Sequence, residues 1–229
     1  MTTHFDRAVA ATALTAGPLS LVITTVWQWM LQPTGAQPTA VDAAEQFPTA
    51  WLVIGLLAVF GPLVWLAGLP AIGASSVPRG RLVTRIGALV TGLGLAAGVG
   101  HLAAYFSLYG AVAAAALPDD GVTAMVRAGE AEPIGNVLLL VFLIGYSLGP
   151  IILTVGLRIG HAVAVWVPLA AVVTAGANLF GGPIAGVVQL VALIAVWAPL
   201  VVLVARGGAT RRDTPTAVVH KKSDVGTRA

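Results

Sequence analysis

Long apolar runs separated by short polar segments dominate the hydrophobic pattern of this chain of 229 residues. A helix needs about 20 apolar residues to cross the hydrocarbon core of a bilayer, and six runs come close to or exceed that length. The predicted spans cover residues 8–31, 47–73, 86–110, 134–157, 162–180 and 183–205. The pattern therefore predicts an all-α integral membrane protein, a six-transmembrane-helix bundle over residues 1–205, with a disordered basic tail over residues 206–229.

The composition supports a membrane protein and excludes several kinds of chemistry. Hydrophobic residues make up 58% of the chain and charged residues 9%, whereas soluble domains carry about 25% charged residues. The chain has no cysteine, which excludes disulfides and thiolate metal sites, and its lysines, Lys221 and Lys222, lie in the tail. We expect no cofactor and no resident metal.

The positions of the charges predict the orientation in the membrane. Of the 12 Lys and Arg residues, all but Arg127 lie in the N-terminus, after the second span, after the fourth span, or in the tail. Acidic residues gather in the alternate segments, 32–46 and 117–133. Because positive charge favours the cytoplasmic side, both termini are expected in the cytoplasm and the protein in the cell membrane. This distribution also explains the net charge of +3 without nucleic acid as a partner.

One face of the third span carries small residues followed by two polar rings. At helical spacing its members are Gly87, Thr91, Gly94, Gly98, His101 and Tyr105. Small residues let the backbones of membrane helices approach closely, so this face is expected to point toward sister helices. The pattern places the third span at the centre of the bundle, with His101 toward the extracytoplasmic side.

Two Gly-Pro pairs occupy corresponding positions in the second and fourth spans. They are Gly61-Pro62 and Gly149-Pro150, and each lies about 14 residues from the outer start of its span. One interpretation is a pair of broken helices that flank a cavity near mid-membrane, as in transporters. The other is an ordinary proline kink.

Polar residues near the outer surface of the spans predict a pocket that opens outward. The candidate ligand-binding residues are Gln28, His101, Tyr105, Tyr146, Asn178 and Gln189. His101 could carry a proton, act as a general base or bond a ligand, and the other catalytic candidates are Tyr105, Asp42 and Glu45. The alternative is that these side chains only join helices by hydrogen bonds.

Four short motifs carry a resemblance to the uncharacterised multi-pass membrane proteins abundant in GC-rich, actinobacterial-type genomes. The motifs are Phe5-Asp6-Arg7-Ala8, Ala16-Gly17-Pro18-Leu19, Gly156-Leu157-Arg158-Ile159-Gly160 and Trp166-Val167-Pro168. This resemblance implies the multi-pass fold and transfers no activity or site. In size and span number the chain is also similar to small integral-membrane terpene cyclases, which implies carboxylates at a cavity mouth that protonate a prenyl chain.

The sequence leaves three functions open. The first is binding or transport of a small amphipathic or hydrophobic molecule through the outward-facing pocket. The second is a membrane-embedded enzyme acting on an isoprenoid or lipid, with His101 and Tyr105 assisted by Asp42, Glu45 or acids of the 119–132 segment. The third is a non-catalytic subunit whose glycine face docks a partner helix, in a complex that could include an ATPase.

Overall fold

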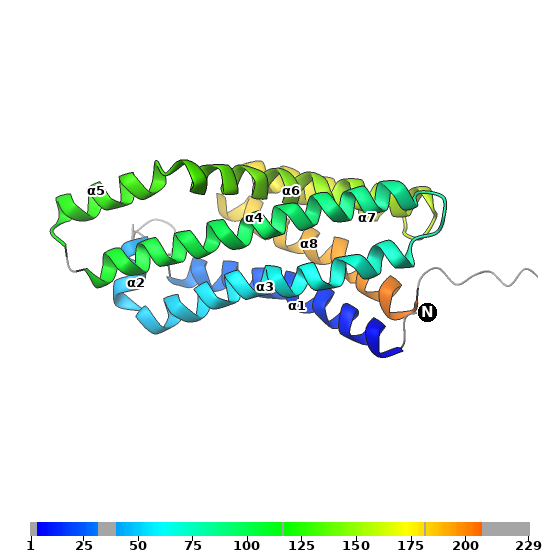
Figure 1. Cartoon of the computed structure of the whole chain (residues 1–229), viewed down its shortest axis with the longest axis horizontal. Coiled ribbons are helices and arrows are strands. Elements are labelled where there is room, and N and C mark those ends of the chain that lie inside the picture. The colour runs from blue at the N-terminus through cyan, green and yellow to red at the C-terminus, as the bar shows by residue number, and fades with distance from the viewer. Residues whose placement is uncertain (1–3, 32–39, 116, 181, 208–229) are drawn as a thin grey trace, which may run out of the picture.

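The computed structural model describes residues 4–31, 40–115, 117–180 and 182–207, and this part of the chain is helical without any strand (Figure 1). The predicted tail, apart from Arg206 and Gly207, lies outside the described residues. The helices are α1 (His4–Leu31), α2 (Ala40–Gln46), α3 (Pro48–Ser75), α4 (Arg81–Ala114), α5 (Asp119–Glu130), α6 (Pro133–Ile159), α7 (Trp166–Phe180) and α8 (Gly182–Ala205).

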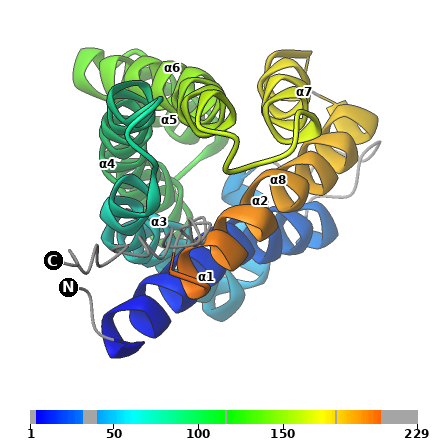
Figure 2. The same ribbon diagram turned by 90° about the vertical axis from the view of Figure 1, so that its right-hand side faces the viewer.

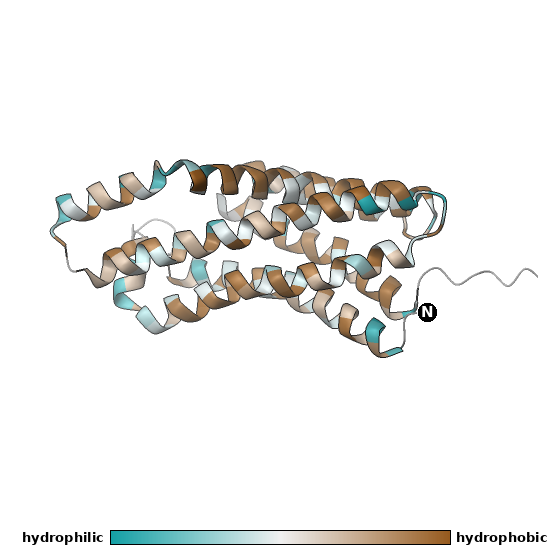
Figure 3. Cartoon of the chain, viewed as in Figure 1, coloured by the Kyte–Doolittle hydropathy of each residue, from teal (hydrophilic) through white to brown (hydrophobic). Residues whose placement is uncertain are grey.

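Five helices, α1, α3, α4, α6 and α8, are long and apolar enough to cross a membrane. Their middle parts are apolar, and polar residues collect toward the ends of the molecule (Figure 3). The remaining expected span forms the shorter α7, whose 15 residues extend about 22 Å. It begins only at Trp166 because the chain turns after α6, where His161 takes a φ of 55°. These features are those of a multi-pass membrane protein.

Two segments expected to be loops contain helices instead. Residues 40–46 form α2, which contacts α3 and α4, and residues 119–130 form α5. Asp119 and Asp120 occupy the first turn of α5, where carboxylates interact favourably with the helix dipole. Both short helices pack near the C-terminal end of α4, whose 34 residues extend about 51 Å and so exceed the thickness of a hydrocarbon core.

The long helices and α7 form a ring in the order α1, α3, α4, α6, α7, α8, which closes where α8 contacts α1 (Figure 2). α4 packs mainly against its ring neighbours α3 and α6. Its other face is exposed, with Leu82, Leu89 and Leu93 more than half accessible. The expectation that this helix is central is therefore wrong, because the bundle is a ring and α4 occupies one place in it.

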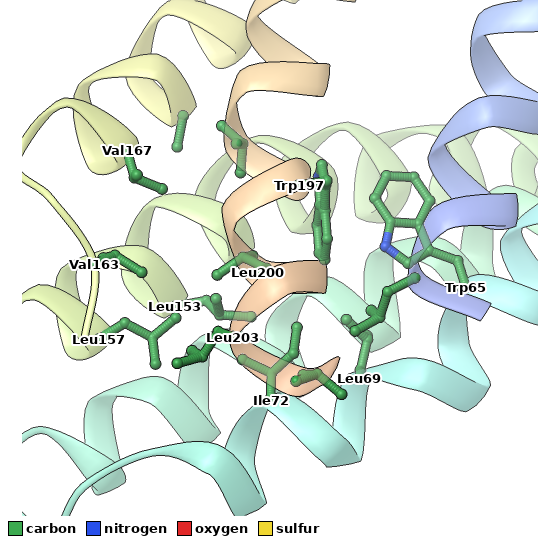
Figure 4. Packing of buried hydrophobic residues seen from close by; sticks show 14 of the residues in the cluster. Trp65, Leu69, Ile72, Leu153, Leu157, Val163, Val167, Trp197, Leu200 and Leu203 are labelled. Atoms are coloured by element: carbon green, nitrogen blue, oxygen red, sulfur yellow. The ribbon is translucent and has the colours of Figure 1, made fainter. Parts of the chain in front are cut away.

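Buried aromatic rings occupy the middle of the ring of helices (Figure 4). The indoles of Trp65 on α3 and Trp197 on α8 meet edge to face with ring centroids 4.6 Å apart. Tyr146 on α6 meets Trp65 in the same way at 6.3 Å. The Trp65 Nε1 is buried without a hydrogen-bond acceptor among the described residues, and in Figure 4 it lies on the side of the ring that faces Trp197.

Small residues bring α4 and α6 into backbone contact. A β-carbon added at Gly94 would lie 2.7 Å from the Cα of Gly145, a distance too short for any real side chain. Further along, Thr91 lies against Gly149, and a β-carbon at Gly87 would collide with the backbone of Leu153. The Thr91 hydroxyl donates to the Gly87 carbonyl at 2.8 Å, so it needs no partner in lipid. The prediction that the glycine face points toward a sister helix is confirmed.

The α1–α3 pair uses the same device. Gly17 on α1 accommodates Trp65, and Gly61 on α3 accommodates the Ser20 side chain. Both Gly-Pro pairs lie inside continuous helices, α3 and α6, and Gly61 and Gly149 serve as contact points for α1 and α4. The interpretation as broken helices is therefore wrong, because the missing side chains admit a neighbouring helix and the helical conformation continues through each proline.

Replacement of Gly94 by alanine tests the α4–α6 contact. We expect Gly94→Ala to destabilise the protein by about 1–3 kcal/mol, because the added methyl group forces two backbones apart. Thermal unfolding of the detergent-solubilised protein measures the change. Gly176→Ala is the matched control, since nothing lies within 4 Å of a β-carbon there and alanine favours the helix. Equal stability of the two variants would contradict the close contact.

Candidate functional site

A hollow of about 430 Å³ lies between the C-terminal half of α4, α5 and the start of α6, and is called here the His101 pocket. Its polar lining consists of His101, Tyr105, Tyr109, Glu130, Glu132 and Asn136. Apolar atoms of Ala104, Leu108 and Leu139 complete the wall. The pocket thus combines an imidazole, two phenols and two carboxylates with an apolar surface.

The helical rise places this pocket near one membrane surface. Measured from Arg85 along α4, His101 lies about 24 Å away, Tyr105 about 30 Å and Tyr109 about 36 Å. A hydrocarbon core about 30 Å thick that begins at Arg85 therefore ends near Tyr105. His101 then lies at the edge of the apolar layer, and Glu130 belongs to the aqueous side.

His101 contributes a buried nitrogen that the described residues leave without a hydrogen bond. The imidazole is half-buried, and its Nδ1 is buried without a hydrogen-bond partner among the described residues. A neutral imidazole has one donor and one acceptor nitrogen. Because Nδ1 has almost no accessible surface, it is the rest of the imidazole that lines the hollow.

Hydrogen bonds fix α5 and the start of α6 around the pocket. The Tyr109 hydroxyl donates to Glu130 Oε1 at 3.0 Å, and Asn136 Nδ2 donates to the Glu130 carbonyl oxygen at 3.0 Å. Glu132 caps α6 by accepting from the backbone N–H of Gly135. Both carboxylates remain exposed, so they form the mouth of the pocket.

An aromatic cluster supports the α4 side of the pocket. The rings of Tyr105 and Tyr109 lie 4.7 Å apart, and Trp51 packs on Phe106 at 4.8 Å. Trp51 Nε1 donates to the Phe106 carbonyl at 3.1 Å, which ties the start of α3 to α4. Gln28 on α1 donates to the Tyr105 hydroxyl at 3.4 Å. The structure thus brings Gln28 to Tyr105, one turn from His101.

The remaining ligand-binding candidates form a second group between α6, α7 and α8. Gln189 Nε2 donates to Asn178 Oδ1 at 3.2 Å, and Asn178 Nδ2 donates to Ser147 Oγ at 3.4 Å. Tyr146 is buried beside them. Its hydroxyl lies close to the Gln189 side chain but makes no hydrogen bond with the described residues. The amides of this group bond to each other across helices, and none of its members lines the His101 pocket.

Asp42 and Glu45 lie on α2, away from the His101 pocket. Ala43 and Ala44 of this helix pack into the cluster around Trp51, and neither carboxylate lines the pocket. The carboxylates that do line it, Glu130 and Glu132, entered the sequence interpretation only as part of the acidic segment 119–132.

Tyr109 and Asn136 were not singled out from the sequence. A signal for the helix α5 was available in the sequence: Val122 and Val126 are spaced one helical turn apart, which predicts a helix with one apolar face. In the structure both valines pack against the cluster around Trp51. Among the described residues no group of three or more His, Asp or Glu side chains is placed to hold a metal ion.

Removal of the Tyr109 hydroxyl tests whether this bond holds α5 in place. We expect Tyr109→Phe to raise amide hydrogen exchange in α5 by about fivefold, since the lost bond to a carboxylate is worth about 1 kcal/mol at an exposed site. Hydrogen exchange read by mass spectrometry measures this. Tyr105→Phe is the control, because its hydroxyl bonds to Gln28 on α1, and a similar rise in that variant would contradict the assignment.

Comparison with known proteins identified no similar protein. A scan against protein-family models, a search of curated proteins and a search of solved structures each found no match to the chain. The geometry of the pocket is therefore the basis for assigning a function.

Proposed function

We propose that the His101 pocket binds a small amphipathic molecule that enters from the outer membrane surface. The observation that carries the proposal is one hollow that combines the imidazole of His101 with the carboxylates of Glu130 and Glu132 at its mouth. The polar end of the ligand contacts these groups, and its apolar end lies against Leu108 and Leu139.

The charges at the mouth favour a cationic or hydrogen-bond-donating head group. Arg127 is the single basic residue between residues 86 and 157, whereas Glu130 and Glu132 both line the pocket. The phenol rings of Tyr105 and Tyr109 add faces that attract cations. An alkylamine matches both the carboxylates and the apolar wall.

The orientation with both termini in the cytoplasm belongs to the same proposal. The helices α2 and α5, which carry acidic residues, lie at one end of the molecule, and the N-terminus lies at the other (Figure 1). The first turns of α1, the connection from α3 to α4 and the end of α6 carry Arg7, Arg79 and Arg158. The positive-inside rule assigns that basic end to the cytoplasm. We propose that α7, together with the turn before it, makes the sixth crossing.

The contacts below the pocket favour binding over passage through the membrane. A β-carbon at Gly98 would collide with Phe142, and Gly94 lies against Gly145, so α4 and α6 are closed toward the basic end. Transport between these helices requires them to separate. The glycine face is filled by α6, which leaves no room there for the partner helix of an accessory subunit.

A membrane-embedded enzyme acting on an isoprenoid or lipid is the second candidate. His101 and the carboxylates of Glu130 and Glu132 line one hollow next to lipid, as an acid–base pair for such a substrate requires. Asp42 and Glu45 have no place in this version, since neither lines the pocket. The pocket residues are the same in both candidates, so ligand binding is the first property to test.

Photocrosslinking tests the pocket in protein reconstituted into nanodiscs. We expect a diazirine-bearing alkylamine to label α4, α5 or α6 saturably and the matched neutral alcohol to label them weakly. His101→Leu and Glu130→Gln should each reduce amine labelling about fivefold or more, because each removes a polar partner of the head group. Asn178→Ala is the control, since Asn178 belongs to the second polar group. Equal labelling by amine and alcohol, or unchanged labelling in the His101→Leu variant, would refute the proposal.

Single cysteines test the orientation, because the native chain has none. In intact cells a membrane-impermeant maleimide should label Ala128→Cys on α5 and Phe180→Cys at the end of α7. It should label Val165→Cys, before α7, only after permeabilisation. All three side chains are exposed, so access is decided by the membrane. Labelling of Val165→Cys from outside would reverse the orientation or remove the sixth crossing.

A further inference from the structure

We infer that a groove between α3 and α4 at the basic end binds an anionic phospholipid, with its phosphate on Arg85 and an acyl chain along the groove. The groove, called here the Arg85 groove, has a volume of about 530 Å³. Its apolar wall consists of Leu66, Leu69, Pro70, Ala88, Leu89 and Leu93. It lies at the opposite end of α4 from the His101 pocket.

Two glycines create the space. A β-carbon at Gly92 on α4 would lie 3.4 Å from Leu66 and 3.7 Å from Leu69. Because glycine has no side chain, the groove is open at that level. Gly73 on α3 lies under the stem of Arg85, where a β-carbon would be 3.6 Å from Arg85 Cγ. The Arg85 side chain is thus seated at one end of an apolar channel.

The guanidinium of Arg85 is not neutralised by the residues that the structure describes. No acidic side chain forms an ion pair with Arg85 in the described part of the chain, and Arg79 and Arg81 precede it on the same surface. Asp6, an acid of the basic end, lines a neighbouring hollow together with Arg7, and this hollow shares Pro70 and Ala74 with the Arg85 groove. A phosphate therefore meets an excess of positive charge at the mouth of the groove.

The dimensions favour an acyl chain over a helix from another protein. From Arg85 to Leu93 the groove follows α4 for about 12 Å, whereas a transmembrane helix would need a face about 30 Å long. The tail of any lipid could enter such a groove, so the selectivity for an anionic lipid comes from the guanidinium of Arg85. Basic pockets between membrane helices are known to bind anionic head groups. The site does not depend on the proposed function of the His101 pocket.

Lipid retention measures this inference. The full chain, purified in mild detergent, is titrated with dioleoyl phosphatidylglycerol or dioleoyl phosphatidylcholine, and bound lipid is counted by native mass spectrometry. We expect the native protein to retain phosphatidylglycerol in preference to phosphatidylcholine. Arg85→Gln should weaken retention of phosphatidylglycerol about fivefold, since the attraction of one basic residue to an anionic surface changes the binding constant by about that factor.

Gly92→Leu should reduce retention of both lipids in the groove, because leucine fills it from a position where its β-carbon makes ordinary contacts. Arg158→Gln, at the same end but outside the groove, and Gly176→Leu, on an open helix face, are the matched controls. Equal retention of the two lipids, unchanged retention in Arg85→Gln, or an equal loss in Arg158→Gln would each overturn the inference.

Discussion

The close backbone contact between α4 and α6 determines the position of the groups that line the His101 pocket. Lipid tails are as apolar as leucine, so membrane helices associate by packing at short range and not by the hydrophobic effect. Gly94 against Gly145 and Thr91 against Gly149 fix the register of the pair. Because α5 joins the end of α4 to the start of α6, that register also places Glu130 and Glu132 around the hollow that contains His101.

The sequence was sufficient to predict the all-helical membrane fold and the face that α4 uses, because both follow from local patterns of apolar and small residues. It did not identify α6 as the partner, since Gly17 of α1 and Gly61 of α3 lie on faces that are just as small. The ring arrangement was missed for a related reason. Trp65 and Trp197 fill the middle of the ring of helices. Nothing in their local sequence distinguishes an indole side chain that faces the core from one that faces the membrane interface.

The sequence predicts a depth for each candidate residue and not its direction around the bundle. Residues such as His101 and Asn178 were placed in one outer layer because depth follows from counting residues along a helix. Whether two residues in one layer meet depends on the order of helices in the ring, which separates α4 from α7 by α6. α5 was not predicted because it has no buried residue, and its contacts with α4 and α6 make it part of a pocket.

The two ends of the α3–α4 pair satisfy their charges by different means. At the acidic end, Glu130 accepts from Tyr109, and Glu132 accepts from the backbone of α6, so the protein supplies donors to its own carboxylates. At the basic end Arg85 has no carboxylate partner in the described part of the chain. This difference is consistent with the membrane as solvent: anionic head groups can neutralise an arginine at the bilayer surface, but they repel a carboxylate. In the proposed lipid site, a phosphate takes the place of a carboxylate beside Arg85, whereas at the acidic end Tyr109 and the backbone of α6 supply the donors.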